Sequence, residues 1–260
     1  MESITSADGT VLSCQEDGRG PPLLLVHGTT ADHSRWQAVT PQLSQQFTVY
    51  AMDRRGRGAS SDGPEYHLAR EAEDVAAIAE AIGEPVFVLG HSYGAVCTLE
   101  AAPLTDRIAK LALYEPPIPT GVPMYPPGVP ERMQSLIDEG QWEDALEIFF
   151  KEVVRMPDHE FVPYRQLPMW NRRIQMAPTI PRELAIDRTY RFDPVRFADL
   201  RIPTLLLLGG DSPEMFKRAV DTVHEAVPHS TVVVLPGQQH VGMDTNPELF
   251  LREVVRFLSE

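Results

Sequence analysis

The segment that most constrains the fold of this chain is Gly90–Gly94 (GHSYG), which follows the apolar run 85–89 and precedes the small-residue stretch 95–98. Its serine lies between a predicted strand and a predicted helix, on a turn so tight that only glycine avoids clashes two residues before and after it. Such a turn holds the hydroxyl out above the sheet, where the N–H groups of the next helix point at any anion that forms. The sequence therefore predicts an α/β fold that presents Ser92 as a nucleophile.

Two more polar residues follow short apolar runs near the end of the chain. Asp211 comes after the run 204–208, and His240 comes after the run 231–235. Unbroken apolar runs of this length are typical of strands that are buried on both faces. Both residues should therefore emerge at the carboxyl edge of the sheet together with Ser92, which is the edge where open α/β sheets bind ligands.

Taken in chain order, these pieces resemble the serine-nucleophile branch of the α/β-hydrolase superfamily, and the resemblance covers nearly the whole chain. The matching pieces are His27-Gly28, the turn 53–58, Gly90–Gly94, Asp211 and His240. The resemblance implies a mostly parallel eight-stranded sheet with helices on both faces and a helical cap insertion. Alternation of predicted strands and helices along the chain independently favours such a sheet.

The resemblance also implies a role for each residue of the site. Ser92 would be the nucleophile, His240 the general base, and Asp211 the acid that orients the imidazole. The backbone N–H groups of Thr29 and Tyr93 would form the oxyanion hole, in the loop and turn positions where this family places them. No cofactor is implied.

The identity of the acid is open between two residues. The family often places its acid three residues after the strand-end glycine, whereas Asp211 lies two residues after Gly209. Glu115 is the alternative, because it follows the run 110–114 and some branches, the haloalkane dehalogenases among them, carry their acid after that earlier strand. We prefer Asp211, because it lies in a strand-to-helix loop and a predicted boundary can slip by a residue or two.

The domain organisation is predicted as a core of residues 1–115 and 202–260, with an insertion at 116–201. The insertion opens with prolines that exclude a regular helix or a central strand, and helical patches follow at 133–137 and 142–154. By resemblance it is a cap that closes over Ser92 and shapes the substrate cavity.

The insertion is rich in aromatic and thioether side chains. Most of them should dock it onto the core, while some line a largely apolar pocket for a small-molecule substrate. Arginines at 165, 172 and 173 have the chemistry to hold a carboxylate, although arginines on a cap are more often solvated. The aromatic and methionine residues are Met124, Tyr125, Met133, Trp142, Phe149, Phe150, Met156, Phe161, Tyr164, Met169, Trp170 and Met176.

Composition limits the partners. The formal net charge of −14 would repel nucleic acids and anionic membranes. The first residues lack a signal-peptide pattern, the chain has no apolar stretch of membrane-spanning length, and its two cysteines, Cys14 and Cys97, suit a reducing cytoplasm. The histidines show no metal-binding spacing, and the turn 53–58 lacks a phosphate-loop pattern, so Arg54 and Arg55 are predicted to form structural pairs.

These features favour a serine hydrolase that cleaves an ester, thioester or lactone of a small, largely apolar substrate through an acyl-enzyme on Ser92. Alternatives on the same fold are a lyase, cyclase or isomerase that uses His240 as a base, and a ligand receptor with slow turnover. Epoxide hydrolases and dehalogenases are disfavoured, because those branches normally carry a carboxylate where this chain has Ser92.

Overall fold

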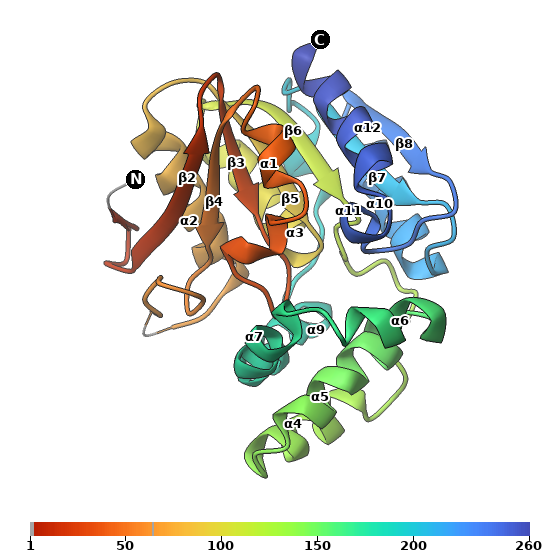
Figure 1. Ribbon diagram of the computed structural model, residues 1–260. Coiled ribbons are helices and arrows are strands. Elements are labelled where there is room, and N and C mark those ends of the chain that lie inside the picture. Colours follow the sequence, from red (N-terminus) through yellow and green to blue (C-terminus); the bar gives the residue numbers. More distant parts are fainter. Residues whose placement is uncertain (1–2, 64) are drawn as a thin grey trace.

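The computed structural model describes residues 3–63 and 65–260; Met1 and Glu2, at the start of the predicted core, and Pro64 lie outside the described residues. An eight-stranded sheet with the order β1-β2-β4-β3-β5-β6-β7-β8 forms the centre of the molecule (Figure 1). β2 pairs antiparallel with β1 and β4, and all other neighbours are parallel. The strands are β1 Ile4–Thr5, β2 Val11–Gly18, β3 Pro22–Val26, β4 Thr48–Asp53, β5 Val86–His91, β6 Ile108–Tyr114, β7 Thr204–Gly209 and β8 Ser230–Leu235.

The apolar runs of the sequence form the central strands, so the predicted sheet is confirmed. Alternate residues of β3 face opposite sides: Leu24 packs in one apolar cluster, whereas Leu23 and Leu25 pack in another. Both clusters are solvent-free at these positions, where each buried leucine contributes roughly 1.5–3 kcal/mol. A strand buried on both faces cannot alternate polar and apolar residues, which explains its unbroken apolar sequence.

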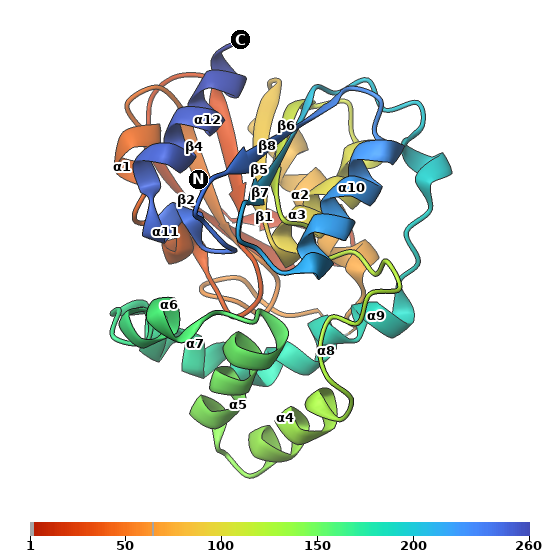
Figure 2. The ribbon, with the colours of Figure 1, turned by 90° about the vertical axis from the view of Figure 1, so that its right-hand side faces the viewer.

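Helices cover both faces of the sheet, as predicted. One face packs against α2 (Leu68–Ile82), α3 (Tyr93–Ala101) and α10 (Glu214–Ala226). The other packs against α1 (Thr40–Leu43) and α12 (Pro247–Ser259), and Figure 2 shows these two groups on either side of the strands. The short helices α11 (Gly242–Thr245), η1 (His33–Trp36) and η2 (Ala102–Leu104) complete the connections.

The insertion is helical and lies beyond one end of the sheet (Figures 1 and 2). It has an apolar cluster of its own. The predicted helical patches appear with two changes, since the first helix already starts at Val129 and the second ends as the π-helix η3. Its elements are α4 Val129–Asp138, α5 Trp142–Ile148, η3 Phe149–Val153, α6 Asp158–Tyr164, α7 Met169–Met176, η4 Ala177–Thr179, α8 Ile180–Leu184, α9 Ile186–Thr189 and η5 Pro194–Phe197.

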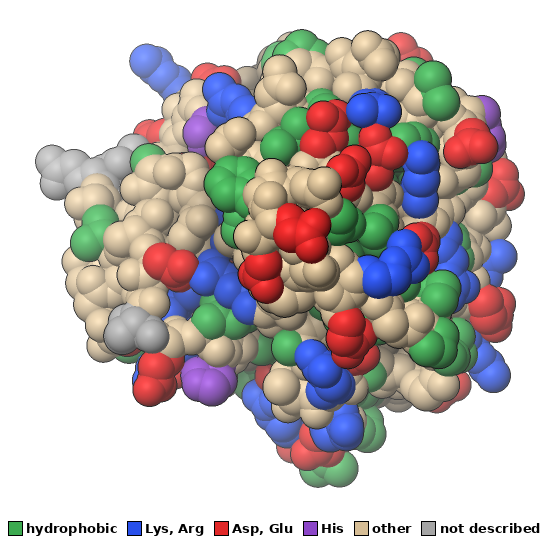
Figure 3. All heavy atoms as spheres, turned by 90° about the horizontal axis from the view of Figure 1, so that it is seen from below, with side chains coloured by type: hydrophobic (Ala, Val, Ile, Leu, Met, Phe, Trp, Pro, Cys, Tyr) green, Lys and Arg blue, Asp and Glu red, His purple; other side chains and the backbone are tan. Residues whose placement is uncertain are grey.

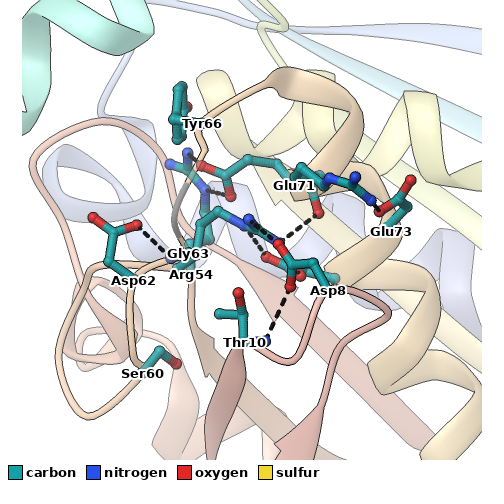
Figure 4. A network of polar contacts seen from close by, with 12 residues as sticks. Asp8, Thr10, Arg54, Ser60, Asp62, Gly63, Tyr66, Glu71 and Glu73 are labelled. Atoms are coloured by element: carbon teal, nitrogen blue, oxygen red, sulfur yellow. Dashed lines mark hydrogen bonds and ion pairs between the residues drawn. The ribbon is translucent and has the colours of Figure 1, made fainter.

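Buried arginines fix the turn after β4. Arg54 pairs with Glu71 of α2 at 2.5 Å (Figure 4), and Arg55 pairs with Asp74 at 2.7 Å, so the predicted structural pairs are present. Arg54 also reaches Glu183 of the insertion at 2.8 Å. Because a buried carboxylate needs a paired cation, this contact ties the insertion to the core.

Burial alone would raise the pKa of Glu183, but the guanidinium groups of Arg54 and Arg57 outweigh it and lower that pKa. The ionised form of Glu183 is therefore the one that the fold stabilises.

The surface carries both signs of charge. Seen from the insertion side, acidic, basic and hydrophobic side chains are interspersed (Figure 3). Among the described residues, the helices are too short or too polar to span a bilayer.

Candidate active site

Ser92 lies on the predicted tight turn between β5 and α3. Its backbone has φ 56° and ψ −127°, an unfavourable conformation for a residue with a side chain. A Cβ on Gly90 would lie 2.6 Å from the Cα of Ala95, and one on Gly94 would lie 2.3 Å from the carbonyl oxygen of His27. Both glycines are therefore required by close backbone approach, and the turn holds Ser92 in place.

His240 lies in the loop between β8 and α11, and its imidazole is fixed from several sides. Its Nδ1 is 2.6 Å from Oε2 of Glu115, and its ring stacks on Phe216 with the ring centroids 4.2 Å apart. The Nε2 of His91 donates to the carbonyl oxygen of His240 at 2.8 Å, and the hydroxyl of Tyr114 donates to the preceding carbonyl. The contact with Glu115 thus involves Nδ1 of the imidazole and not Nε2.

Glu115, not Asp211, is the carboxylate at His240, which corrects our preference for Asp211. Glu115 follows β6 with a φ of 48° and is fully buried. Its Oε1 accepts hydrogen bonds from the backbone N–H of Gly209 at 2.7 Å and from the hydroxyl of Ser212 at 2.5 Å. Asp211 is solvent-exposed, and its backbone N–H donates to Gln238 at 3.0 Å.

The physical reason lies in the sheet. β6 and β7 are neighbouring parallel strands, so a residue after either one can reach the same histidine. Ser212 stands three residues after Gly209, where the resembling family often has its acid, and here it supplies a hydroxyl donor to Glu115.

The loop after β3 packs directly on the serine turn. A Cβ on Gly28 would lie 2.8 Å from the Cβ of Ser92, so the loop backbone touches the predicted nucleophile. His27 is buried and its Nε2 accepts from the backbone N–H of Arg54 at 3.1 Å, while burial holds its pKa well below the ordinary value. It stays neutral and braces the loop that carries Thr29, whose N–H is one of the two predicted oxyanion donors.

Two cavities meet at Ser92 and His240. The first, which we call the arginine cavity, is also lined by Arg35, Tyr164 and Arg173. The second, which we call the apolar cavity, is lined mainly by apolar side chains. Thr29 lines both cavities, and the apolar cavity is further lined by Tyr93, Pro117, Met124, Ile186, Met215 and Phe216.

The insertion supplies part of each lining. Of its aromatic and methionine side chains, Phe149, Phe150, Tyr164 and Met124 reach these cavities, while others such as Trp170 pack inside the insertion. The three arginines that were candidates for holding a carboxylate lie in different environments. Arg165 pairs with Glu143 and Glu147 at the surface, and Arg172 is exposed near Asp32. Arg173 is buried and lines the arginine cavity, as Ser92 does.

Residues 23–253 match the sequence model of a family described as "Alpha/beta hydrolase family". The chain belongs to this family. The crystal structure of an alpha/beta hydrolase from Sphaerobacter thermophilus is 34% identical in sequence to this chain and superimposes on it with a TM-score of 0.86. The match covers 99% of this chain and 100% of the S. thermophilus chain. The predicted family and fold are therefore confirmed.

Two relatives of this alpha/beta hydrolase carry names that state a reaction. It is 36% identical over 124 residues to N-formylmaleamate deformylase from Pseudomonas putida, and this match spans 46% of each chain, less than half of that relative's length. It is 25% identical to 2-(acetamidomethylene)succinate hydrolase from Mesorhizobium japonicum, across 95% of this chain and 91% of the relative. Both names describe hydrolytic reactions.

Proposed function

We propose that the protein is a serine hydrolase that cleaves an ester, thioester or lactone of a small substrate through an acyl-enzyme on Ser92. One observation carries the proposal: His240 has its Nδ1 2.6 Å from the buried Glu115, and it lines with Ser92 the cavities of the site. A buried carboxylate on Nδ1 fixes the tautomer in which Nε2 accepts a proton, as a general base requires.

The first half of the reaction forms the acyl-enzyme. Nε2 of His240 takes the hydroxyl proton of Ser92 while Oγ attacks the substrate carbonyl, and Glu115 stabilises the resulting imidazolium. The backbone N–H groups of Thr29 and Tyr93 stabilise the oxyanion. The tetrahedral intermediate then collapses, and His240 returns the proton to the leaving oxygen or sulfur.

The second half regenerates the enzyme. Water gives one proton to His240 and attacks the acyl carbon, and collapse of the second intermediate returns that proton to Oγ of Ser92. No further reactant is needed.

Amide cleavage is the second candidate, and the names of the relatives favour it. N-formylmaleamate deformylase is named for the removal of an N-formyl group, and its name and that of the succinate hydrolase describe substrates with an acylated nitrogen. The same steps break an amide when His240 protonates the leaving nitrogen.

A small-molecule substrate and a cytoplasmic location remain part of the proposal, the latter supported by the free, buried thiols of Cys14 and Cys97.

The test combines p-nitrophenyl acetate hydrolysis with fluorophosphonate labelling, and it extends to N-formyl amides. We expect wild-type protein to be labelled on Ser92 and to turn over the ester, and Ser92→Ala to lose both, with turnover reduced by at least about a thousandfold. Full activity in Ser92→Ala would refute the proposal. Labelling without turnover of esters or amides would favour the lyase, cyclase, isomerase or receptor alternatives.

A further inference from the structure

Arg173 differs from the other buried arginines of the described chain in lacking an acidic partner there. Arg35 pairs with Asp244, and Arg54, Arg55 and Arg57 pair with glutamates or aspartates. Arg173, on α7, is only 5% exposed. Its NH1 donates to three neutral oxygens, namely the carbonyl oxygens of Thr29 at 3.3 Å and Thr30 at 3.1 Å and the hydroxyl of Thr30 at 2.8 Å.

Asp244 favours the charged form of Arg173, but its carboxylate is already ion-paired with Arg35. A buried guanidinium without an ion pair of its own is unfavourable. Burial lowers the pKa of Arg173, yet an arginine side chain keeps its proton at neutral pH. Neutral oxygens satisfy hydrogen bonds without neutralising the charge, and a buried charge ordinarily needs an opposite one. The two buried guanidinium groups of Arg35 and Arg173 thus share one acidic residue, Asp244, and an anionic ligand would balance the remaining positive charge.

Unpartnered donors gather at the same cavity. Within the described residues, the Nε atoms of Arg173 and Arg35 are buried without hydrogen-bond partners, and both residues line the arginine cavity. The guanidinium carbon of Arg173 lies 5.4 Å from the ring centroids of both Phe150 and Tyr164, which hold its plane in position. Unsatisfied donors at a cavity are what a bound oxyanion would satisfy.

We propose that Arg173 binds a free carboxylate of the substrate, so that the preferred substrates are small acyl compounds that carry a carboxylate beside the scissile bond. This inference rests on the proposed function, because the same cavity contains Ser92 and His240. A carboxylate fits better than a phosphate monoester, since one unpaired cation balances one negative charge, whereas a phosphate monoester carries nearly two. The apolar cavity would take the uncharged part of the molecule.

Docking of the insertion onto the loop after β3 is the alternative role of Arg173, and binding measurements separate the two. The experiment is calorimetry in the Ser92→Ala background, where chemistry does not interfere, with monoethyl succinate and diethyl succinate as probes. We expect Ser92→Ala to bind the monoester much more tightly than the diester. Adding Arg173→Gln should weaken monoester binding by roughly 30- to 1,000-fold and diester binding by no more than a few-fold.

Arg172→Gln is the matched control, because it removes the same charge from the adjacent, exposed position. It should change monoester binding by about twofold or less. Arg173→Lys provides a second variant that keeps the charge, and it should bind the monoester more tightly than Arg173→Gln and less tightly than arginine. Circular dichroism checks that each variant is folded.

Equal affinity of Ser92→Ala for the monoester and the diester would overturn the inference even if the Arg173 variants fail to fold. So would equal losses of both ligands in Arg173→Gln, or binding of inorganic phosphate as tight as that of the monoester. None of these results bears on the catalytic role of Ser92, which fails only if Ser92→Ala retains turnover.

Discussion

The ends of β6 and β7 lie side by side in the sheet, yet they are built differently. Glu115, after β6, is fully buried and is held by three hydrogen bonds, from His240, Gly209 and Ser212. Asp211, after β7, is exposed to solvent. Burying a carboxylate is unfavourable unless hydrogen-bond donors surround it. The end of β6 supplies the carboxylate, and Gly209 and Ser212 at the end of β7 supply two of its donors.

Replacing the two acids should give the largest contrast. We expect Glu115→Gln to lower kcat/KM for p-nitrophenyl acetate by roughly a thousand- to ten-thousandfold, because an amide there favours the wrong imidazole tautomer. Asp211→Asn should change it by no more than about twofold, as is usual for a surface substitution. The reverse pattern, measured in the same assay, would restore Asp211 as the acid.

Transferring the carboxylate from the end of β6 to the end of β7 by substitution should change kcat/KM by a smaller factor. Glu115→Gly relieves the positive φ at this position and removes the carboxylate, and Ser212→Asp then supplies one from the end of β7. We expect the double variant to recover about 10- to 100-fold in kcat/KM over Glu115→Gly alone, since the triad geometry tolerates acids from different chain positions.

Ser212→Asn in the Glu115→Gly background is the control of similar size without the charge. Equal kcat/KM for the two double variants would show that the end of β7 cannot present an acid to His240.

The smallest expected effect is a pH dependence of folding stability that arises from buried histidines at this edge of the sheet. Burial holds the pKa values of His27, after β3, and His91, at the end of β5, well below the ordinary 6.5. Below about pH 6.5 the unfolded chain binds more protons than the folded chain does. The free energy of unfolding therefore reaches its highest value above about pH 6.5 and decreases as the pH falls. Each histidine contributes at most about 1.4 kcal/mol per pH unit.

His91→Gln keeps an N–H donor for the carbonyl oxygen of His240 but cannot titrate. Guanidinium unfolding at pH 5 to 7.5 should therefore show a shallower pH dependence in this variant than in wild type. An unchanged slope would mean that His91 is protonated in the folded protein.

Much of this edge is readable from the sequence because it depends on short local patterns. The apolar runs predict the central strands, and the glycines at 90 and 94 predict the turn at Ser92. The carboxylate at His240 is not specified by such a pattern, because an apolar run precedes both Glu115 and Asp211, and only burial and hydrogen bonding distinguish the two. The hydroxyl of Ser212 carried no signal of its own beyond its spacing from Gly209.

The sequence of the insertion does not specify which of its side chains line the cavities. Its aromatic content predicted a pocket lining, but only packing separates Phe150, at the cavity, from Trp170, inside the insertion. Arg172 and Arg173 are adjacent in the sequence, yet Arg172 faces solvent while Arg173 is buried and lines the arginine cavity. That difference arises from the orientation of α7, which no local pattern specifies.

The most direct test is proton NMR of the His240 Nδ1–H, which should resonate far downfield of the backbone amides when it is held by a buried carboxylate. We predict this signal in wild type and in Asp211→Asn, and its loss in Glu115→Gln and His240→Gln. A signal that survives Glu115→Gln but disappears in Asp211→Asn would contradict the assignment of Glu115 as the residue that orients His240 toward Ser92.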